Sequence, residues 1–153
     1  MADTNELQKT FTAMPFQANG AGLTLSAVAA GNIFTDGAYQ GAFTAPAWFF
    51  LAGLVLAYLL FAVTSKLDLN SRNMLIAQSF RRTAMKCEVA EHPTERMKEI
   101  AVDCTARADA LDASQLPSSQ IAMLTRATNW LNNLSLGCFV VGAIIGLTIL
   151  ARG

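Results

Sequence analysis

The sequence predicts an all-α integral membrane protein with two or three transmembrane helices and a cytoplasmic helical hairpin between the last two. Hydrophobic residues make up 53% of the 153 residues and charged residues 14%, whereas soluble domains average about 45–50% and about 25%. Seventeen of the 22 charged residues lie between Lys66 and Arg126. The rest of the chain is therefore apolar enough for a bilayer, and a charged segment separates its two parts.

Three long windows contain no charged residue: 10–35, 37–65 and 127–151. A spanning helix needs about 20 mostly apolar residues to cross about 30 Å of hydrocarbon. Within the second window, residues 47–63 carry no strongly polar side chain, which predicts a transmembrane helix at about 46–65. Residues 134–150 are equally apolar and follow Asn132 and Asn133. They predict a C-terminal transmembrane helix within 131–153.

The first window is more polar, because only residues 21–34 are apolar and glycine, serine and threonine interrupt them. This length is also typical of re-entrant, interfacial or signal-peptide segments. Gly22, Ser26 and Ala30 recur every four residues, a spacing that lets membrane helices approach closely. We therefore expect a third span at about 19–35, with 36–45 as the turn of a membrane hairpin.

The distribution of cations predicts the orientation. Five cations and one acid lie between Lys66 and Lys86, and segments rich in Lys and Arg stay in the cytoplasm. The middle segment is therefore expected inside the cell and the C-terminus outside. If residues 19–35 span, the N-terminus is cytoplasmic. Trp48 and Trp130 fit interfacial anchors at the ends of their spans.

The middle segment, 66–130, reads as helices separated by prolines. We expect the second span to continue to about Ala90, where His92-Pro93 ends it. A second helix is expected from Pro93 to about Asp112, followed by a linker at 114–117 and a last helix from about Pro117 into the final span. The apolar positions of the helix from Pro93 to about Asp112 follow a helical spacing: Met97, Ile100, Ala101, Cys104, Ala108 and Leu111. The chain thus divides into 1–65, 66–130 and 131–153.

The sequence contains no recognisable catalytic, redox or metal-binding motif. His92 lacks a second ligand at helical spacing, and Cys87, Cys104 and Cys138 lack metal or redox spacing. No phosphate loop, dinucleotide fingerprint or nucleophile elbow occurs. We therefore expect that the protein is not an enzyme and that it has no cofactor, no metal site and no catalytic residue. Lys and Arg together equal Asp and Glu in number, which argues against nucleic acid as a partner.

Small residues mark candidate helix-packing faces. Gly142 and Gly146 form a G-x-x-x-G pair in the last span, and Gly53 with Ala57 offers a similar face in the second. Such faces allow close helix contact within a chain or between copies. The expected partners are the lipid bilayer and either further copies of the chain or the subunits of a larger membrane complex.

Three strings carry a resemblance. They are residues 19–22 (NGAG), 50–56 (FLAGLVL), and 134–136 (LSL) followed by 139–142 (FVVG). Together they resemble small uncharacterised bacterial inner-membrane proteins with an N-terminal membrane hairpin, a charged helical loop and a C-terminal membrane helix. The resemblance covers about half the chain. It implies a third span and a bacterial inner membrane, and no activity. The layout is also similar to small membrane effectors of prokaryotic antiviral systems.

Two functions follow as hypotheses. The first is a non-enzymatic membrane assembly or accessory protein that packs through its small-residue faces and cytoplasmic hairpin. The alternative is a homo-oligomeric pore or channel, including an effector that opens on a trigger. No ionisable side chain lies within the two apolar spans, which argues against proton-coupled transport.

Overall fold

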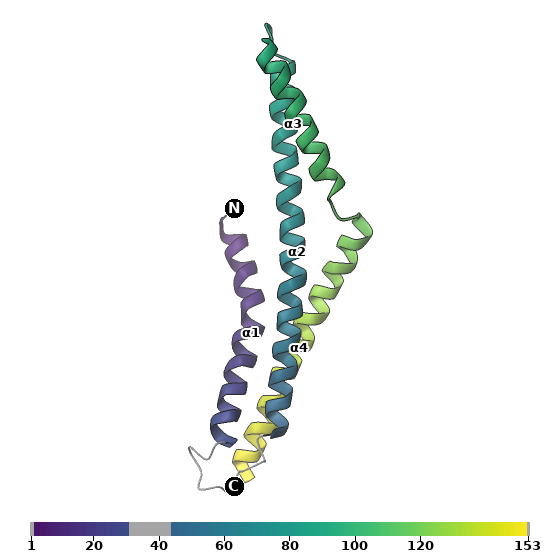
Figure 1. Cartoon of the computed structure of the whole chain (residues 1–153). Helices are drawn as coiled ribbons and strands as arrows, with labels where there is room; N and C mark the ends of the chain where they lie inside the picture. The colour runs from purple at the N-terminus through teal and green to yellow at the C-terminus, as the bar shows by residue number, and fades with distance from the viewer. Residues whose placement is uncertain (1, 31–43, 153) are drawn as a thin grey trace. The chain divides into compact units, whose positions relative to one another are not determined.

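Most of the described chain is helical, and residues 89–94 and 114–117 form the described connections between helices. The computed structural model describes the backbone of residues 2–30 and 44–152 and the side chains of residues 13–29 and 44–152. Four helices follow one another (Figure 1). They are α1 (Ala2–Ala30), α2 (Thr44–Glu88), α3 (Glu95–Ala113) and α4 (Ser118–Arg152). No strand occurs among these residues.

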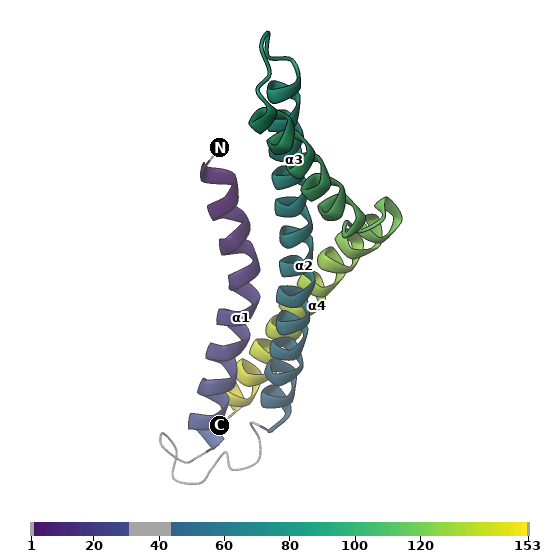
Figure 2. The ribbon, with the colours of Figure 1, turned by 45° about the horizontal axis from the view of Figure 1, so that its top comes forward.

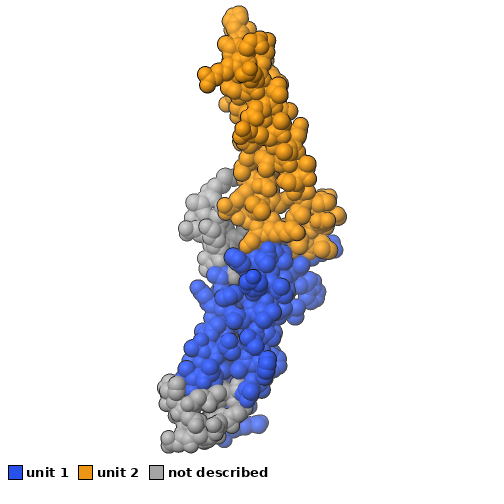
Figure 3. Space-filling view, in the orientation of Figure 1, with its two compact units in different colours: residues 1–63, 125–153 blue, residues 64–124 orange. Residues whose placement is uncertain are grey.

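The helices form two compact units, coloured separately in Figure 3. Unit 1 contains residues 1–63 and 125–153, and unit 2 contains residues 64–124. Both α2 and α4 contribute to each unit. The residues that separate them in α2, Val63 and Thr64, lie just before Lys66, where the first charged side chain of that helix occurs.

Unit 1 packs α1 against the first part of α2 and the second part of α4, which lie side by side in both Figure 1 and Figure 2. Its buried residues recur at intervals of three and four, the spacing by which helices interdigitate along a seam. On α1 they are Pro15, Asn19, Gly22 and Ser26, and on α2 they are Pro46, Phe50, Gly53, Ala57 and Leu60.

Two described helices, α2 and α4, are long and apolar enough to cross a membrane. The charge-free part of α2, 44–65, is about 33 Å long, and that of α4, 127–151, is about 38 Å. With 29 residues α1 is long enough, but it is not among these apolar helices.

The N-terminal helix differs from the sequence expectation. A span at 19–35 was expected, but α1 begins at Ala2, includes Pro15 and ends at Ala30. The expected residues 31–35, and 36–43 of the expected turn, lie outside the described residues. Residues 2–14 are mostly good helix formers, among them Ala2, Glu6 and Lys9, which accounts for the early start.

Unit 2 contains an antiparallel hairpin of α2 and α3. Its core is made of small side chains, Ala84, Ala101 and Cys104, against which Phe80 and Cys87 pack. Ala77 and Ala108 are also buried. The buried positions of α3 repeat in steps of three and four, and those of α2 are seven residues apart with Phe80 between them. Alanines at these positions let the two backbones lie close.

Polar contacts also link these helices. Arg81 of α2 pairs with Asp109, at 3.5 Å, and with Asp112 of α3. The Leu116 N–H, in the linker to α4, donates to Asn70 Oδ1 at 2.8 Å. Exposed ion pairs contribute about 0–1 kcal/mol each, so these contacts orient the hairpin more than they stabilise it.

The structure of α3 corrects two expectations from the sequence: where the helix begins and which residues form its apolar stripe. The helix begins at Glu95 rather than Pro93, because the Thr94 side chain caps it by accepting from the Met97 N–H at 3.3 Å. Ile100, expected on the apolar stripe, is exposed, and the stripe narrows to Ala101, Cys104 and Ala108.

The alanine seam generates the first prediction. Ala108→Leu would insert three carbon atoms into a fully buried position, and overpacking of this kind costs about 1–3 kcal/mol. We expect a lower melting temperature in thermal unfolding of the full chain followed by circular dichroism. Ala113→Leu, at an exposed position at the end of the same helix, is the matched control. Equal melting temperatures for the two variants would contradict the seam.

Candidate functional site

The most unusual group of side chains lies where the three helices of unit 1 meet. Asn19 of α1 and Ser135 of α4 are both 0% exposed. The Asn19 Nδ2 donates to the Ser135 backbone carbonyl and to Ser135 Oγ, at 3.1 Å each. Ser135 Oγ in turn donates to the Gly53 carbonyl of α2 at 2.7 Å. One amide and one hydroxyl therefore join α1, α2 and α4.

The same amide also forms a hydrogen bond within its own helix. Asn19 Nδ2 donates to the Pro15 carbonyl, one turn earlier, at 2.8 Å. All three acceptors around Nδ2 are oxygen atoms, so the amide must present its N–H groups to them. This fixes the orientation of the carboxamide.

Asn19 Oδ1 points the other way and has no conventional hydrogen-bond partner. A Cβ built on Gly53 would collide with Oδ1. This oxygen therefore takes the space that a side chain at position 53 would need. Only glycine at position 53 leaves room for it.

One turn further, Phe50 fills the space between the helices. A Cβ on Gly22 of α1 would collide with the Phe50 ring, and one on Gly142 of α4 would lie 3.0 Å from it. The Phe139 ring lies against Phe50 at a centroid distance of 5.9 Å and an angle of 49°. The two glycines thus form the walls of the slot that holds this ring.

These contacts determine the directions of the helices. Asn19 meets Gly53 and Gly22 meets Phe50, so α1 and α2 run antiparallel. Ser135 meets Gly53 and Gly142 meets Phe50, so α2 and α4 are antiparallel as well. The chain therefore crosses unit 1 three times in alternating directions.

The residues expected on packing faces have different environments. Gly22, Gly53 and Gly142 lie in the close contacts just described, and Ser26 and Ala57 are buried in unit 1. Gly146 is half-buried. The side chain of Ala30 lies outside the described ones.

The two expected anchors are exposed. Trp48 is 67% and Trp130 69% exposed, and each belongs to a helix that is apolar enough to cross a membrane. About two thirds of each residue is thus available to the surroundings of the protein.

Sequence reasoning missed Asn19, Ser135 and Phe50 as members of this site. Each lies on the same helical line as a small residue that was identified: Asn19 three residues before Gly22, and Phe50 three before Gly53. A search for seven-residue periodicity without regard to polarity would have found these lines. Hydropathy alone treats Asn19 as an interruption.

No protein-family model, curated protein or solved structure matches this chain.

The chemistry of the site is that of helix packing. No group of three His, Cys, Asp or Glu side chains able to hold a metal ion occurs among the described residues. Asn19 and Ser135 do not titrate, and their N–H and O–H groups are engaged with backbone carbonyls. Phe50 fills the space between the three helices. If the protein forms a pore, as in the alternative hypothesis, the conducting path would need to lie between copies of the chain.

The close contact at Gly53 generates the second prediction. Gly53→Ala places a methyl group against Asn19 Oδ1 and is expected to lower the free energy of unfolding by about 1–3 kcal/mol. Gly137→Ala is the control, because its Cβ meets nothing within 4 Å; alanine should stabilise the helix there by up to about 1 kcal/mol. Thermal unfolding in one detergent measures both. An equal response of the two variants would rule out the close contact.

The third prediction tests whether Asn19 causes the cost at Gly53. In an Asn19→Ala background the methyl group of Gly53→Ala has space, so its cost should fall by about 1 kcal/mol or more in a double-mutant cycle. Gly22→Ala serves as the control, since its methyl group meets Phe50 and its cost should persist. Additive effects of Asn19→Ala and Gly53→Ala would show that the two residues do not interact.

Proposed function

We propose that the protein is a non-enzymatic integral membrane protein that crosses the bacterial inner membrane three times and carries a cytoplasmic helical hairpin for assembly. The observation that supports this most directly is the distribution of side chains in unit 1. Its interior contains the polar side chains of Asn19, Ser26 and Ser135 beside Phe50 and Leu60. Most of its other large apolar side chains face outward.

The outward apolar side chains cover both candidate spans. On α2 they are Trp48, Phe49, Leu51, Val55, Tyr58, Leu59 and Phe61, and on α4 Leu134, Val140, Val141, Ile144, Leu147 and Leu150. Water-soluble monomers rarely expose such continuous apolar surfaces. In lipid this arrangement is favourable, because helices there associate through small residues and interhelical hydrogen bonds.

A third span is supported by the partners of α1. Its residues Asn19 and Gly22 contact Gly53 and Phe50 within the charge-free part of α2, and Asn19 contacts Ser135 in that of α4. A helix that packs here lies at the depth of the apolar segments. Residues 10–30 of α1 carry no charge and are about 31 Å long, which matches the hydrocarbon thickness.

The orientation follows from the cations of unit 2. Lys66, Arg72, Arg81, Arg82 and Lys86 lie on α2 beyond its charge-free part, and cations in this position favour the cytoplasm. With three alternating crossings, the N-terminus shares the cytoplasm with the hairpin and the C-terminus lies outside.

The proposed role of the hairpin in assembly rests on which surfaces of the chain are free to contact another protein. Gly22, Gly53 and Gly142 are already occupied by Asn19 and Phe50 of the same chain. These small-residue faces therefore hold one chain together. Recognition of copies or of other subunits falls to the exposed faces of the hairpin.

The fourth prediction concerns topology. A phosphatase that is active only outside the cytoplasm should be inactive when fused to the N-terminus and active when fused to the C-terminus. In a chain with Cys87, Cys104 and Cys138 replaced by alanine, Ser118→Cys should be shielded from a membrane-impermeant thiol reagent added to intact cells.

Two results would contradict the proposal in different ways. Activity of the phosphatase at both termini would leave only α2 and α4 as spans. Labelling of Ser118→Cys in intact cells would reverse the orientation. The same label after cell lysis is the control that position 118 is reactive.

A further inference from the structure

The side of α2 that faces away from α3 carries two cations, Arg82 and Lys86. Ala77 and Ala84 face α3, and on a helix with 3.6 residues per turn the opposite side holds a different set of residues. We name this set the α2 outer line: Leu75, Arg82, Met85, Lys86 and Val89, all exposed. Neither Arg82 nor Lys86 forms an ion pair with a described residue, whereas their neighbour Arg81 does.

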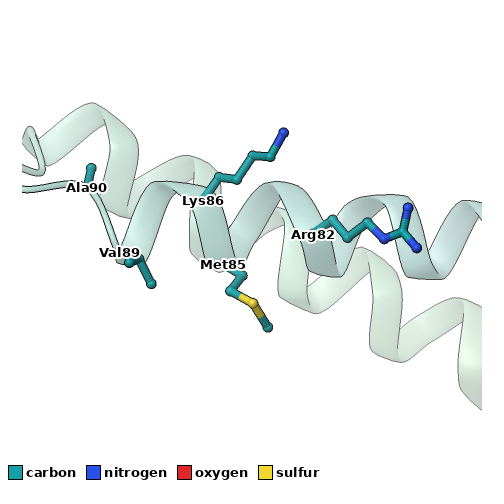
Figure 4. Close-up of a pocket in the computed structure, with 5 residues that line it drawn as sticks. All are labelled: Arg82, Met85, Lys86, Val89 and Ala90. Carbon is teal, nitrogen blue, oxygen red and sulfur yellow. The ribbon is translucent and has the colours of Figure 1, made fainter.

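Figure 4 shows most of this line at the end of α2. Arg82, Met85, Lys86, Val89 and Ala90 line a shallow concavity. Lys86 extends to one side of the helix, and Met85 and Val89 extend to the other. The line is thus an apolar strip with a basic edge, and it contains no acidic residue from Leu75 to Val89.

The corresponding side of α3 has the opposite charge. Ala101, Cys104 and Ala108 face α2, and the opposite side consists of Glu95, Glu99, Val102, Ala106 and Ala110, which we name the α3 outer line. All five are exposed, and Val102 is 71% exposed. Glu99 forms no ion pair with a described residue, and no cation occurs on the line. Its alanines leave room for a close neighbour.

The two lines match in level along the hairpin. Ala84 packs in one cluster with Ala101 and Cys104. Lys86 lies two residues closer to the tip of the hairpin than Ala84, and Glu99 lies two residues closer to the tip than Ala101. Two residues correspond to about 3 Å along each helix. Lys86 and Glu99 therefore lie at the same level, and Met85 and Val102 lie within about 3 Å of each other along the hairpin axis. Within one chain they face opposite sides of the hairpin and do not meet.

From this complementarity we propose that the α2 outer line of one copy binds the α3 outer line of a second copy. The inference rests on the proposed membrane topology, because identical anchors hold the hairpins of all copies at the same level and in the same direction. The intermolecular pair of helices is then antiparallel, like the pair within each chain. Lys86 faces Glu99 of the next copy, and Met85 lies close to its Val102.

The contact is heterologous, because each copy uses one outer line toward one neighbour and the other line toward another. Contacts of this type close into rings when the rotation between copies permits it. A second copy fits better than a lipid surface, since the α3 outer line is acidic and its apolar residues are small. It also provides Glu99 as a partner for Lys86.

Cross-linking of full chains in isolated membranes is the fifth prediction. Two differently tagged, otherwise cysteine-free chains carry Lys86→Cys and Glu99→Cys, respectively. A bismaleimide should join one chain of each kind, and should not join two chains of the same kind. A single chain with both cysteines should give a ladder of multimers. Thr83→Cys, on a lateral side of α2, replaces Lys86→Cys in the matched control and should give little product with Glu99→Cys.

Charge reversal tests the same contact without cysteine. Lys86→Glu should lower the yield of an Arg82→Cys to Asp103→Cys cross-link about fivefold, and Glu99→Lys in the partner chain should restore it. Arg96→Glu, an equal change of charge beside the α3 outer line, should have no such effect.

Several results would overturn the proposal. Lys86→Cys chains that cross-link to each other would indicate a symmetric dimer instead. The absence of any product, in chains whose phosphatase fusions still report a cytoplasmic N-terminus and an external C-terminus, would remove the interface and leave the topology standing. Loss of both the cross-linked product and the expected pattern of phosphatase activity would instead reject the proposed function.

Discussion

The hydrogen bonds of the Asn19 amide and the Ser135 hydroxyl hold unit 1 together. Through Pro15, Gly53 and Ser135 they engage carbonyl groups on all three helices. They act together with the packing of the Phe50 ring against Gly22, Gly142 and Phe139. Interhelical hydrogen bonds in membranes contribute about 0.6 kcal/mol on average and up to about 1.7 kcal/mol. Their larger effect is on specificity, because only one register of the three helices satisfies them.

The two units use small residues for different reasons. In unit 1, glycine makes room for a particular neighbour, the Asn19 oxygen or the Phe50 ring. In unit 2, alanine builds a uniform narrow seam, and water can drive the burial of Phe80 and the alanines. Unit 2 nevertheless leaves Leu75, Met85, Val89 and Val102 outside its core. A hairpin that buries its small residues and exposes several large ones is better suited to contact than to independent stability.

The sequence predicted the helices more successfully than their contacts. The ends of α2, α3 and α4 are marked by charge, proline and capping residues, which act locally, so these bounds fell within a few residues. The long α1 was not foreseen, because Pro15 and Asn19 are typical interruptions of helices. The contact of Asn19 with Ser135 joins residues 116 positions apart. It depends on which faces of three helices meet, and no local pattern specifies that. The small-residue stripes were visible; their polar partners were not.

The long separation between Asn19 and Ser135 has a consequence for how the protein is made. Ser135 is synthesised after Asn19, and at about 5–20 residues per second the interval is about 6–23 s. During this time the Asn19 amide lacks its partners on α4, and α2 has received only one of its two neighbours. The bundle of unit 1 is therefore completed last, by the arrival of the final helix. A nascent chain that stalls before α4 emerges therefore leaves the Asn19 amide without Ser135 and the Phe50 ring without Gly142 and Phe139.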